Sequence, residues 1–162
     1  MKSMRRKEKE IQDKSEIIKI LKITKYLTIA MSKDKVPYLV TLTHGYDSKK
    51  NVIYFHCAKK CKKIDILKEN NVVWGQALID KGYVEGKCDH LYATAQFMGT
   101  VTFLEDFAEK QHALQIMIKQ QESIPVKVIE KQITNESVKN VNIGKIEITY
   151  LSGKKSDEVI IS

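Results

Sequence analysis

A cluster of lysines stands at the junction between a predicted strand and a predicted helix. The stretch YFHCAKKCKKIDILKENNVVW (residues 54–74) places Lys59, Lys60, Lys62 and Lys63 there. Lysine has the unfavourable charge for the start of a helix, where unpaired backbone N–H groups already carry partial positive charge. A phosphate or another bound anion would turn this repulsion into attraction. The junction therefore predicts an anion site, and a solvated basic loop is an alternative that the spacing leaves equally open.

Two cysteines and a histidine share this junction. Cys57 and Cys61 are four residues apart, and His56 precedes the first. Zinc uses such ligands, but the spacing is loose and Cys88 has only His90 near it, so no metal is expected and small apolar side chains are the favoured interpretation. The neighbouring lysines favour the thiolate form of Cys61, which leaves a reactive cysteine as a second hypothesis.

Length and composition are those of one globular domain. The chain has 162 residues, of which 43% are hydrophobic and 30% charged, and a chain of this length buries a sizeable core. We expect a single domain over residues 1–162, with residues 1–12 flexible. No apolar run approaches the roughly 18 residues of a membrane span and no secretion signal is present, so no membrane partner and a cytoplasmic location are expected.

The charge balance raises the question of a nucleic-acid partner. The formal net charge is +8, from 28 basic and 20 acidic residues, which favours an anionic partner. Arginine, whose planar fork recognises phosphates and base edges, occurs only at Arg5 and Arg6. We therefore expect no nucleic-acid partner. The three cysteines are an odd count in a chain without an export signal, which argues against a disulfide framework.

Alternating apolar residues predict strands interrupted by helices at three places. Asp13 and Asp106 begin sequences typical of capped helices, and a third helix is expected over residues 62–70. A mobile loop is expected over residues 81–89, a bulge at Gly99 and a short extension over residues 126–130. The strands are expected at residues 26–32, 37–46, 52–58, 72–79, 91–104 and 141–151. Neighbouring strands come in hairpin pairs, and neither a GxGxxG motif nor a P-loop is present. The pattern thus predicts a mainly β, six-stranded antiparallel barrel with peripheral α-helices.

The order and spacing of several segments resemble one known family over nearly the whole chain. These segments are MRRKEKEI, PYLVTLTHGY, VIYFHCAKKCKKIDILKENNVVW, YATAQFMGTVTFLED and IEITYLSGKKS. Together they are similar to the FMN-binding split-barrel proteins related to pyridoxamine 5′-phosphate oxidase, in particular to the nitroimidazole-resistance branch. The resemblance implies a split β-barrel, a bound FMN (with FAD as the alternative) and a homodimer with flavin at the subunit interface.

The resemblance also implies the cofactor-binding residues. Lys62 and Lys63 match the basic pair that holds the flavin phosphate, and the second strand matches the one that runs beside the isoalloxazine ring. His44 stands where a stronger basic residue often ends that strand, and Cys57 where a hydroxyl residue is common, so the phosphate geometry differs from the usual one. The implied set is Leu39, Thr41, Leu42, Thr43, His44, His56, Cys57, Lys62, Lys63 and Thr94, the last acting from the other subunit.

The implied activity is that of an FMN-dependent oxidoreductase, which passes electrons from a reduced nucleotide to a small-molecule acceptor. Nitro-group reduction is one candidate reaction. Oxidation of pyridoxamine phosphate is disfavoured, because the C-terminal arginines that hold its phosphate in the family are absent from SDEVIIS. No catalytic base is named, because hydride transfer on a flavin need not use one. A non-catalytic flavin- or haem-binding protein or sensor is the alternative.

Overall fold

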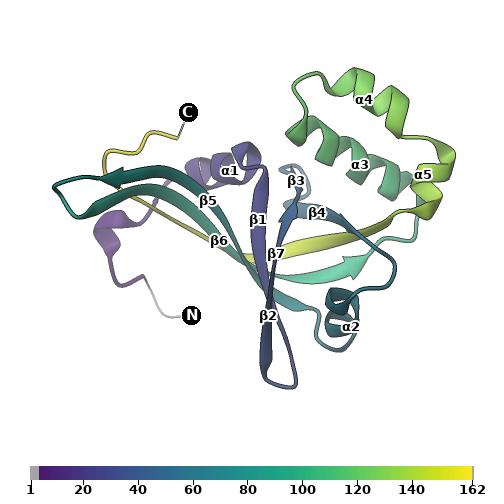
Figure 1. Cartoon of the computed structure of the whole chain (residues 1–162), viewed down its shortest axis with the longest axis horizontal. Helices are drawn as coiled ribbons and strands as arrows, with labels where there is room; N and C mark the ends of the chain where they lie inside the picture. The colour runs from purple at the N-terminus through teal and green to yellow at the C-terminus, as the bar shows by residue number, and fades with distance from the viewer. Residues whose placement is uncertain (1–3, 162) are drawn as a thin grey trace.

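One curved antiparallel sheet forms the centre of the molecule, and helices lie around it (Figure 1). The computed structural model describes residues 4–161. The strands are β1 (Tyr26–Lys33), β2 (Val36–Thr43), β3 (Gly45–Asp47), β4 (Val52–Cys57), β5 (Val72–Val84), β6 (Asp89–Phe103) and β7 (Asn142–Lys155). The helices are α1 (Lys14–Ile23), α2 (Lys62–Glu69), α3 (Phe107–Gln121), α4 (Pro125–Gln132), α5 (Asn135–Asn140) and a 3-10 turn, η1 (Lys7–Lys9).

The two helix starts expected at aspartates are capped by those aspartates. The Asp13 carboxylate accepts the backbone N–H of Ser15 at 2.8 Å, and Asp106 accepts that of Glu109 at 2.8 Å. Each cap satisfies one of the N–H groups that a helix start leaves without a partner. The buried face of α1, carrying Ile20 and Leu21, then packs on the sheet.

The sheet has seven strands in the order β2-β1-β5-β6-β7-β4-β3, and every pair is antiparallel. The expected count of six is therefore wrong, and the sheet does not close. The edge strands β2 and β3 are consecutive in sequence and joined by His44 alone. The sheet must therefore curl until its two edges meet at this residue, which gives the outline of a barrel with one seam open.

The seventh strand arises because the segment expected as one strand, residues 37–46, breaks at His44. Helix α3 crosses so close to this corner that a Cβ on Gly45 would lie 2.7 Å from the backbone N and Cα of Met117. Only glycine fits this approach. The chain leaves β2 at Thr43 and starts β3 at Gly45 on the other side of the seam.

The main core fills the inside of the curl. Phe55 and Phe97 are fully buried there, and each ring lies over a glycine. A Cβ on Gly75 would lie 2.1 Å from Cζ of Phe97, and one on Gly144 would lie 2.3 Å from Cζ of Phe55. A smaller cluster of buried side chains packs α3 against β4: Val52, Tyr54, Leu104, Ala113, Met117 and Ile143.

Two expectations about irregular segments had different outcomes. The bulge at Gly99 is confirmed, because the β6–β7 register shifts between Met98 and Gly99. The segment 81–89 is not mainly a loop: β5 continues to Val84, and β6 starts at Asp89 after a short turn. Figure 1 shows this hairpin extending away from the body of the sheet.

The N-terminal segment expected to be flexible, residues 1–12, begins outside the described residues. Within its described part, Ile11 is buried and its backbone N–H donates to the Gly153 carbonyl at 3.0 Å. This contact attaches the segment before α1 to the end of β7. Across residues 4–161, none of the helices combines the length and the apolar character that crossing a membrane requires.

Candidate functional site

Helix α2 starts without a side-chain cap. Its N-cap residue, Cys61, makes no capping hydrogen bond with its side chain, and the Cys61 carbonyl accepts the N–H of Ile64 at 2.9 Å. The first N–H groups of α2 are therefore available to a ligand, and they carry the partial positive charge of a helix start. The sequence places Lys62 and Lys63 at this point, as expected for an anion site.

The two lysines are fixed in different ways. The Lys62 ammonium lies 4.8 Å from the centre of the Tyr38 ring, which brings α2 beside β2. The Lys63 ammonium lies 3.5 Å from the Sγ atom of Cys61. Neither lysine forms a salt bridge within the described chain. Two positive charges thus stand beside the free helix start, and Asp65, the acidic residue of the first turn, forms no salt bridge with either of them among the described residues.

Strand β2 offers a free edge next to this corner, because it pairs only with β1. In an edge strand, alternate residues direct their N–H and C=O groups away from the sheet, where a ligand can use them. Leu39 and Thr41 lie on the outer face, whereas Leu42 packs against the core. The Thr41 hydroxyl is 2.9 Å from that of Thr28. Leu42 can therefore meet a ligand only through its backbone.

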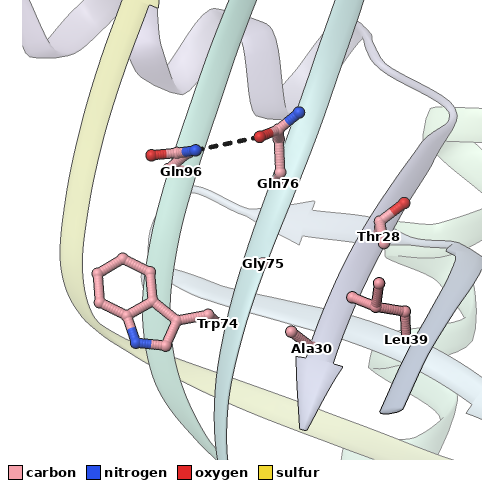
Figure 2. Close-up of a pocket in the computed structure, with 7 residues that line it drawn as sticks. All are labelled: Thr28, Ala30, Leu39, Trp74, Gly75, Gln76 and Gln96. Atoms are coloured by element: carbon pink, nitrogen blue, oxygen red, sulfur yellow. Dashed lines mark hydrogen bonds between the residues drawn. The ribbon is translucent and has the colours of Figure 1, made fainter. Parts of the chain in front are cut away.

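The outer face of β2, β1, β5 and β6 contains an open hollow of about 360 Å³. Figure 2 shows the side chains of Leu39 and Trp74 on this face, with the Gln96 amide donating to that of Gln76 at 3.1 Å. The residues that line it are Thr28, Ala30, Leu39, Trp74, Gly75, Gln76 and Gln96. Of these, only Leu39 was expected at the site. The others come from strands whose neighbours depend on the sheet order, which the sequence alone does not reveal.

Thr94 lies on this outer face but away from β2. Its register partner on β5 is Leu78, and its hydroxyl donates to the Lys154 carbonyl at 3.4 Å. Because β1 and β5 separate β6 from β2, the two strands are roughly 14 Å apart at ordinary strand spacing. One chain therefore does not bring Thr94 together with Leu39, Lys62 and Lys63.

His44 is fully buried at the seam between β2 and β3. Its Nε2 atom lies 3.0 Å from the Leu21 carbonyl and 2.9 Å from the Gln120 amide nitrogen, which connects the end of α1 to α3. Among the described residues, its Nδ1 atom has no hydrogen-bond partner. Burial lowers the pKa of His44, although the hydrogen bond to Leu21 opposes this effect. His44 is thus a neutral packing histidine between helices.

His44 and His56 meet at a small cavity rather than at the lysines. This cavity has a volume of about 160 Å³, and His56, at the end of β4, is exposed at it. Its lining residues are Thr43, His44, His56, Leu114, Met117, Ile118, Gln121 and Glu122. The expected set therefore divides into three groups: the lysine corner with Cys57 and β2, the cavity under α3, and Thr94.

The buried state of His44 predicts a pH-dependent stability. As the pH falls below the ordinary histidine value of 6.5, the unfolded chain takes up a proton before the folded chain does. The contribution of His44 to the free energy of unfolding is therefore complete above pH 6.5. It decreases as the pH falls toward the lowered pKa of the folded state. We expect urea denaturation of His44→Gln to show a smaller loss between about pH 7 and pH 5 than the wild type.

Replacement of an exposed histidine is the matched control for this experiment. His90→Gln removes a half-exposed imidazole, and we expect it to keep the decrease in stability below pH 6.5. If His44→Gln lost as much stability as the wild type over the same pH range, a neutral buried His44 would be ruled out.

An open antiparallel sheet whose edges meet at one residue, with helices outside it, is a split-barrel architecture. The model of the pyridoxamine 5′-phosphate oxidase family matches residues 13–155. The chain therefore belongs to this family, as the sequence motifs predicted.

Solved structures of several proteins share the fold. A candidate 5-nitroimidazole antibiotic resistance protein from Bacteroides thetaiotaomicron is 26% identical, with a TM-score of 0.76 over 90% of this chain and 85% of that chain. The flavocytochrome Anf3 from Azotobacter vinelandii is 14% identical, with a TM-score of 0.79 over 95% of this chain and 72% of that chain. The FAD and heme binding protein from Mycobacterium smegmatis is 15% identical, with a TM-score of 0.76 over 92% of this chain and 74% of that chain. No curated protein matches the chain.

Proposed function

We propose that the protein is an FMN-binding flavoprotein and that it works as an oxidoreductase. The observation that carries the proposal is the uncapped start of α2, where Lys62 and Lys63 stand beside the free edge of β2. Membership of the pyridoxamine 5′-phosphate oxidase family supports it, as do two relatives of the same fold that are named for a flavin.

The phosphate of FMN would be held by the helix start and the two lysines. The backbone N–H groups of the first turn of α2 would donate to its oxygens, while Lys62 and Lys63 neutralise its charge. Tyr38 helps to place Lys62, because the ammonium group lies over its ring. FAD, which carries a diphosphate and an adenosine at this position, is the alternative cofactor.

The remaining residues would orient the ring. The backbone groups that alternate residues of β2 direct outward around Thr41 to Thr43 suit hydrogen bonding to a flat polar edge, and Leu39 offers an apolar contact. A bound flavin supplies hydride acceptance and electron transfer. The chain's own task is to fix the phosphate and orient the ring so that one face of the ring stays open to a reduced nucleotide and a small acceptor.

A titration tests the proposal. The purified protein is expected to bind FMN with a Kd below tens of micromolar and to show a flavin absorbance band, which NADH or NADPH then bleaches under anaerobic conditions. A 5-nitroimidazole is the first acceptor to test, because a relative is named for resistance to this class. Absence of any flavin band on the protein after incubation with saturating FMN and removal of the free cofactor would contradict the proposal.

A non-catalytic flavin or haem carrier is the second candidate, since the Mycobacterium smegmatis relative is named for both cofactors. The rate of flavin reduction separates the two functions. A carrier would bind the cofactor without reduction by either nucleotide, whereas an oxidoreductase would be reduced within seconds to minutes.

We propose further that two chains pair through the outer face of the sheet, with the flavin at the interface. Leu39 is 65% exposed, Trp74 41% and Leu78 50%, and large apolar side chains grouped on one face are typical of a binding surface. The distant Thr94 also supports pairing, because a second chain can bring it to the flavin where one chain cannot.

Size-exclusion chromatography with light scattering checks the dimer. The wild type is expected to elute as a dimer, and Leu39→Glu/Trp74→Glu as a monomer, because two carboxylates would have to be buried between the chains. Val126→Glu, at an exposed residue of α4, is the control and should remain a dimer. A monomeric wild type at tens of micromolar would contradict the pairing.

A further inference from the structure

Cys57 and Cys61 bracket the loop that connects β4 to α2. Cys57 is the last residue of β4 and Cys61 is the N-cap of α2, so three residues separate them. The Cys61 thiol turns back toward the strand, with its Sγ atom 3.7 Å from the carbonyl oxygen of Ala58, the residue after Cys57. Both cysteines are half-buried and carry free thiols. The loop therefore folds the second thiol back toward the first.

The two thiols lie in different surroundings. The Asn142 amide donates to Cys57 Sγ at 3.4 Å, and the Lys63 ammonium donates to Cys61 Sγ at 3.5 Å. Burial raises the pKa of Cys57, and the neighbouring Cys61 thiol, which also hydrogen-bonds to it, raises the pKa further. Cys57 is thus held as a thiol, whereas the Sγ atom of Cys61 is the one in contact with a lysine ammonium group.

We propose that Cys57 and Cys61 form a redox-active dithiol that reacts with low-molecular-weight disulfides. The Cys61 thiolate attacks one sulfur of the small disulfide, forms a mixed disulfide and releases one small thiol. Cys57 then loses its proton, attacks Sγ of Cys61 and releases the second small thiol. The protein gives up two electrons and two protons, and the small disulfide is reduced to two thiols.

The position of this pair gives the reaction a consequence for the site, which rests on the proposed function. Cys61 is the extended residue from which α2 starts, with φ −167° and ψ 158°, and Lys62 and Lys63 follow it directly. A bond from Cys61 to the end of β4 would change the direction of these N–H groups and lysines. The oxidised protein should therefore bind FMN about 10-fold more weakly than the reduced protein, a loss of roughly one charge-assisted hydrogen bond.

Mass spectrometry of the full chain tests the dithiol. The Cys88→Ser variant, which leaves only the pair, is incubated with oxidised glutathione, quenched with N-ethylmaleimide and digested. We expect a loss of two hydrogen masses, no maleimide on either cysteine and a cross-link between residues 57 and 61. Full alkylation of both cysteines, or stable glutathione adducts on both without a cross-link, would overturn the proposal.

Single replacements of the cysteines test which one attacks the small disulfide and which one then attacks the mixed disulfide. Both replacements are made in the Cys88→Ser protein. Cys57→Ser should accumulate a glutathione adduct on Cys61, while Cys61→Ser should react with oxidised glutathione at least about 10-fold more slowly than Cys57→Ser. Lys63→Met should slow the first step several-fold, and Lys49→Met, at an exposed lysine of the β3–β4 turn, should not. Equal rates for the two cysteine variants would refute the assigned order of attack.

The flavin experiment is separate from the thiol experiment. Failure of the reduced protein to bind FMN would contradict the proposed function and leave the cross-link result standing. Equal FMN affinity of the reduced and oxidised forms would contradict the link between the dithiol and the helix start alone.

Discussion

Replacing Lys62 and Lys63 together by glutamate raises the Kd for FMN by at least about 100-fold. Each charge-assisted hydrogen bond to a phosphate contributes about 1.5–3 kcal/mol, so the loss of two corresponds to at least roughly 3 kcal/mol. The two carboxylates would then repel the phosphate directly. Fluorescence titration of FMN measures the change, because the flavin emission responds to binding.

The matched control changes the same number of charges elsewhere. Lys49→Glu/Lys50→Glu replaces two exposed lysines in the β3–β4 turn. If net charge alone attracts FMN, both double variants should weaken binding equally. We expect the control to change the Kd by less than about 3-fold, since exposed distant charges are screened at physiological salt. An unchanged Kd in Lys62→Glu/Lys63→Glu would remove the assigned phosphate site.

Replacing Phe97 by alanine lowers the free energy of unfolding by about 3–5 kcal/mol. Phe97 is fully buried, and its ring lies so close over Gly75 that a Cβ there would be 2.1 Å from Cζ. Its loss leaves a cavity between β5 and β6, at the centre of the sheet order. Urea denaturation followed by circular dichroism measures the change.

An exposed aromatic residue is the control for this prediction. Tyr83, on the β5–β6 hairpin, is 58% exposed, and Tyr83→Ala should change the free energy of unfolding by less than about 1 kcal/mol. If Phe97→Ala unfolded at the same midpoint urea concentration as the wild type, the described packing of Phe97 in the main core would be contradicted.

The sequence was most informative where a feature depends on neighbours in the chain. The lysines at 62 and 63 mark the start of α2 because a strand ends and an apolar helical pattern begins within a few residues. Asp106 was identified as a cap, and Gly99 as a bulge, for the same reason. All of these are local patterns of charge, capping or chain flexibility.

The sequence was least informative where a feature depends on distant contacts. The break at His44 is imposed by α3, which lies about 70 residues further along the chain and approaches Gly45 too closely for a side chain. The burial of His44 follows from the same helix, so its place away from the lysine corner could not be predicted. The short extension expected over residues 126–130 falls within α4, whereas α5 was missed because its short pattern does not distinguish it from an irregular connection.

The expected residues of the site show the same difference between neighbours in the chain and distant contacts. The expected residues of β2 and α2 lie near one another because one strand and one helix start carry them, and Lys62 lies over the Tyr38 ring. The partners in the hollow, Trp74, Gln76 and Gln96, depend on the pairing of β1 with β5 and of β5 with β6, which joins segments far apart in the chain. The motif resemblance supplied Thr94, and the sheet order shows why a single chain separates it from β2.

The most direct test of the phosphate site compares FMN with riboflavin, which has the same ring and no phosphate. If the start of α2 with Lys62 and Lys63 holds the phosphate, the wild type binds FMN at least about 100-fold more tightly than riboflavin, by the same hydrogen-bond free energies. In Lys62→Glu/Lys63→Glu this preference disappears. Equal Kd values for the two flavins in the wild type would contradict the account.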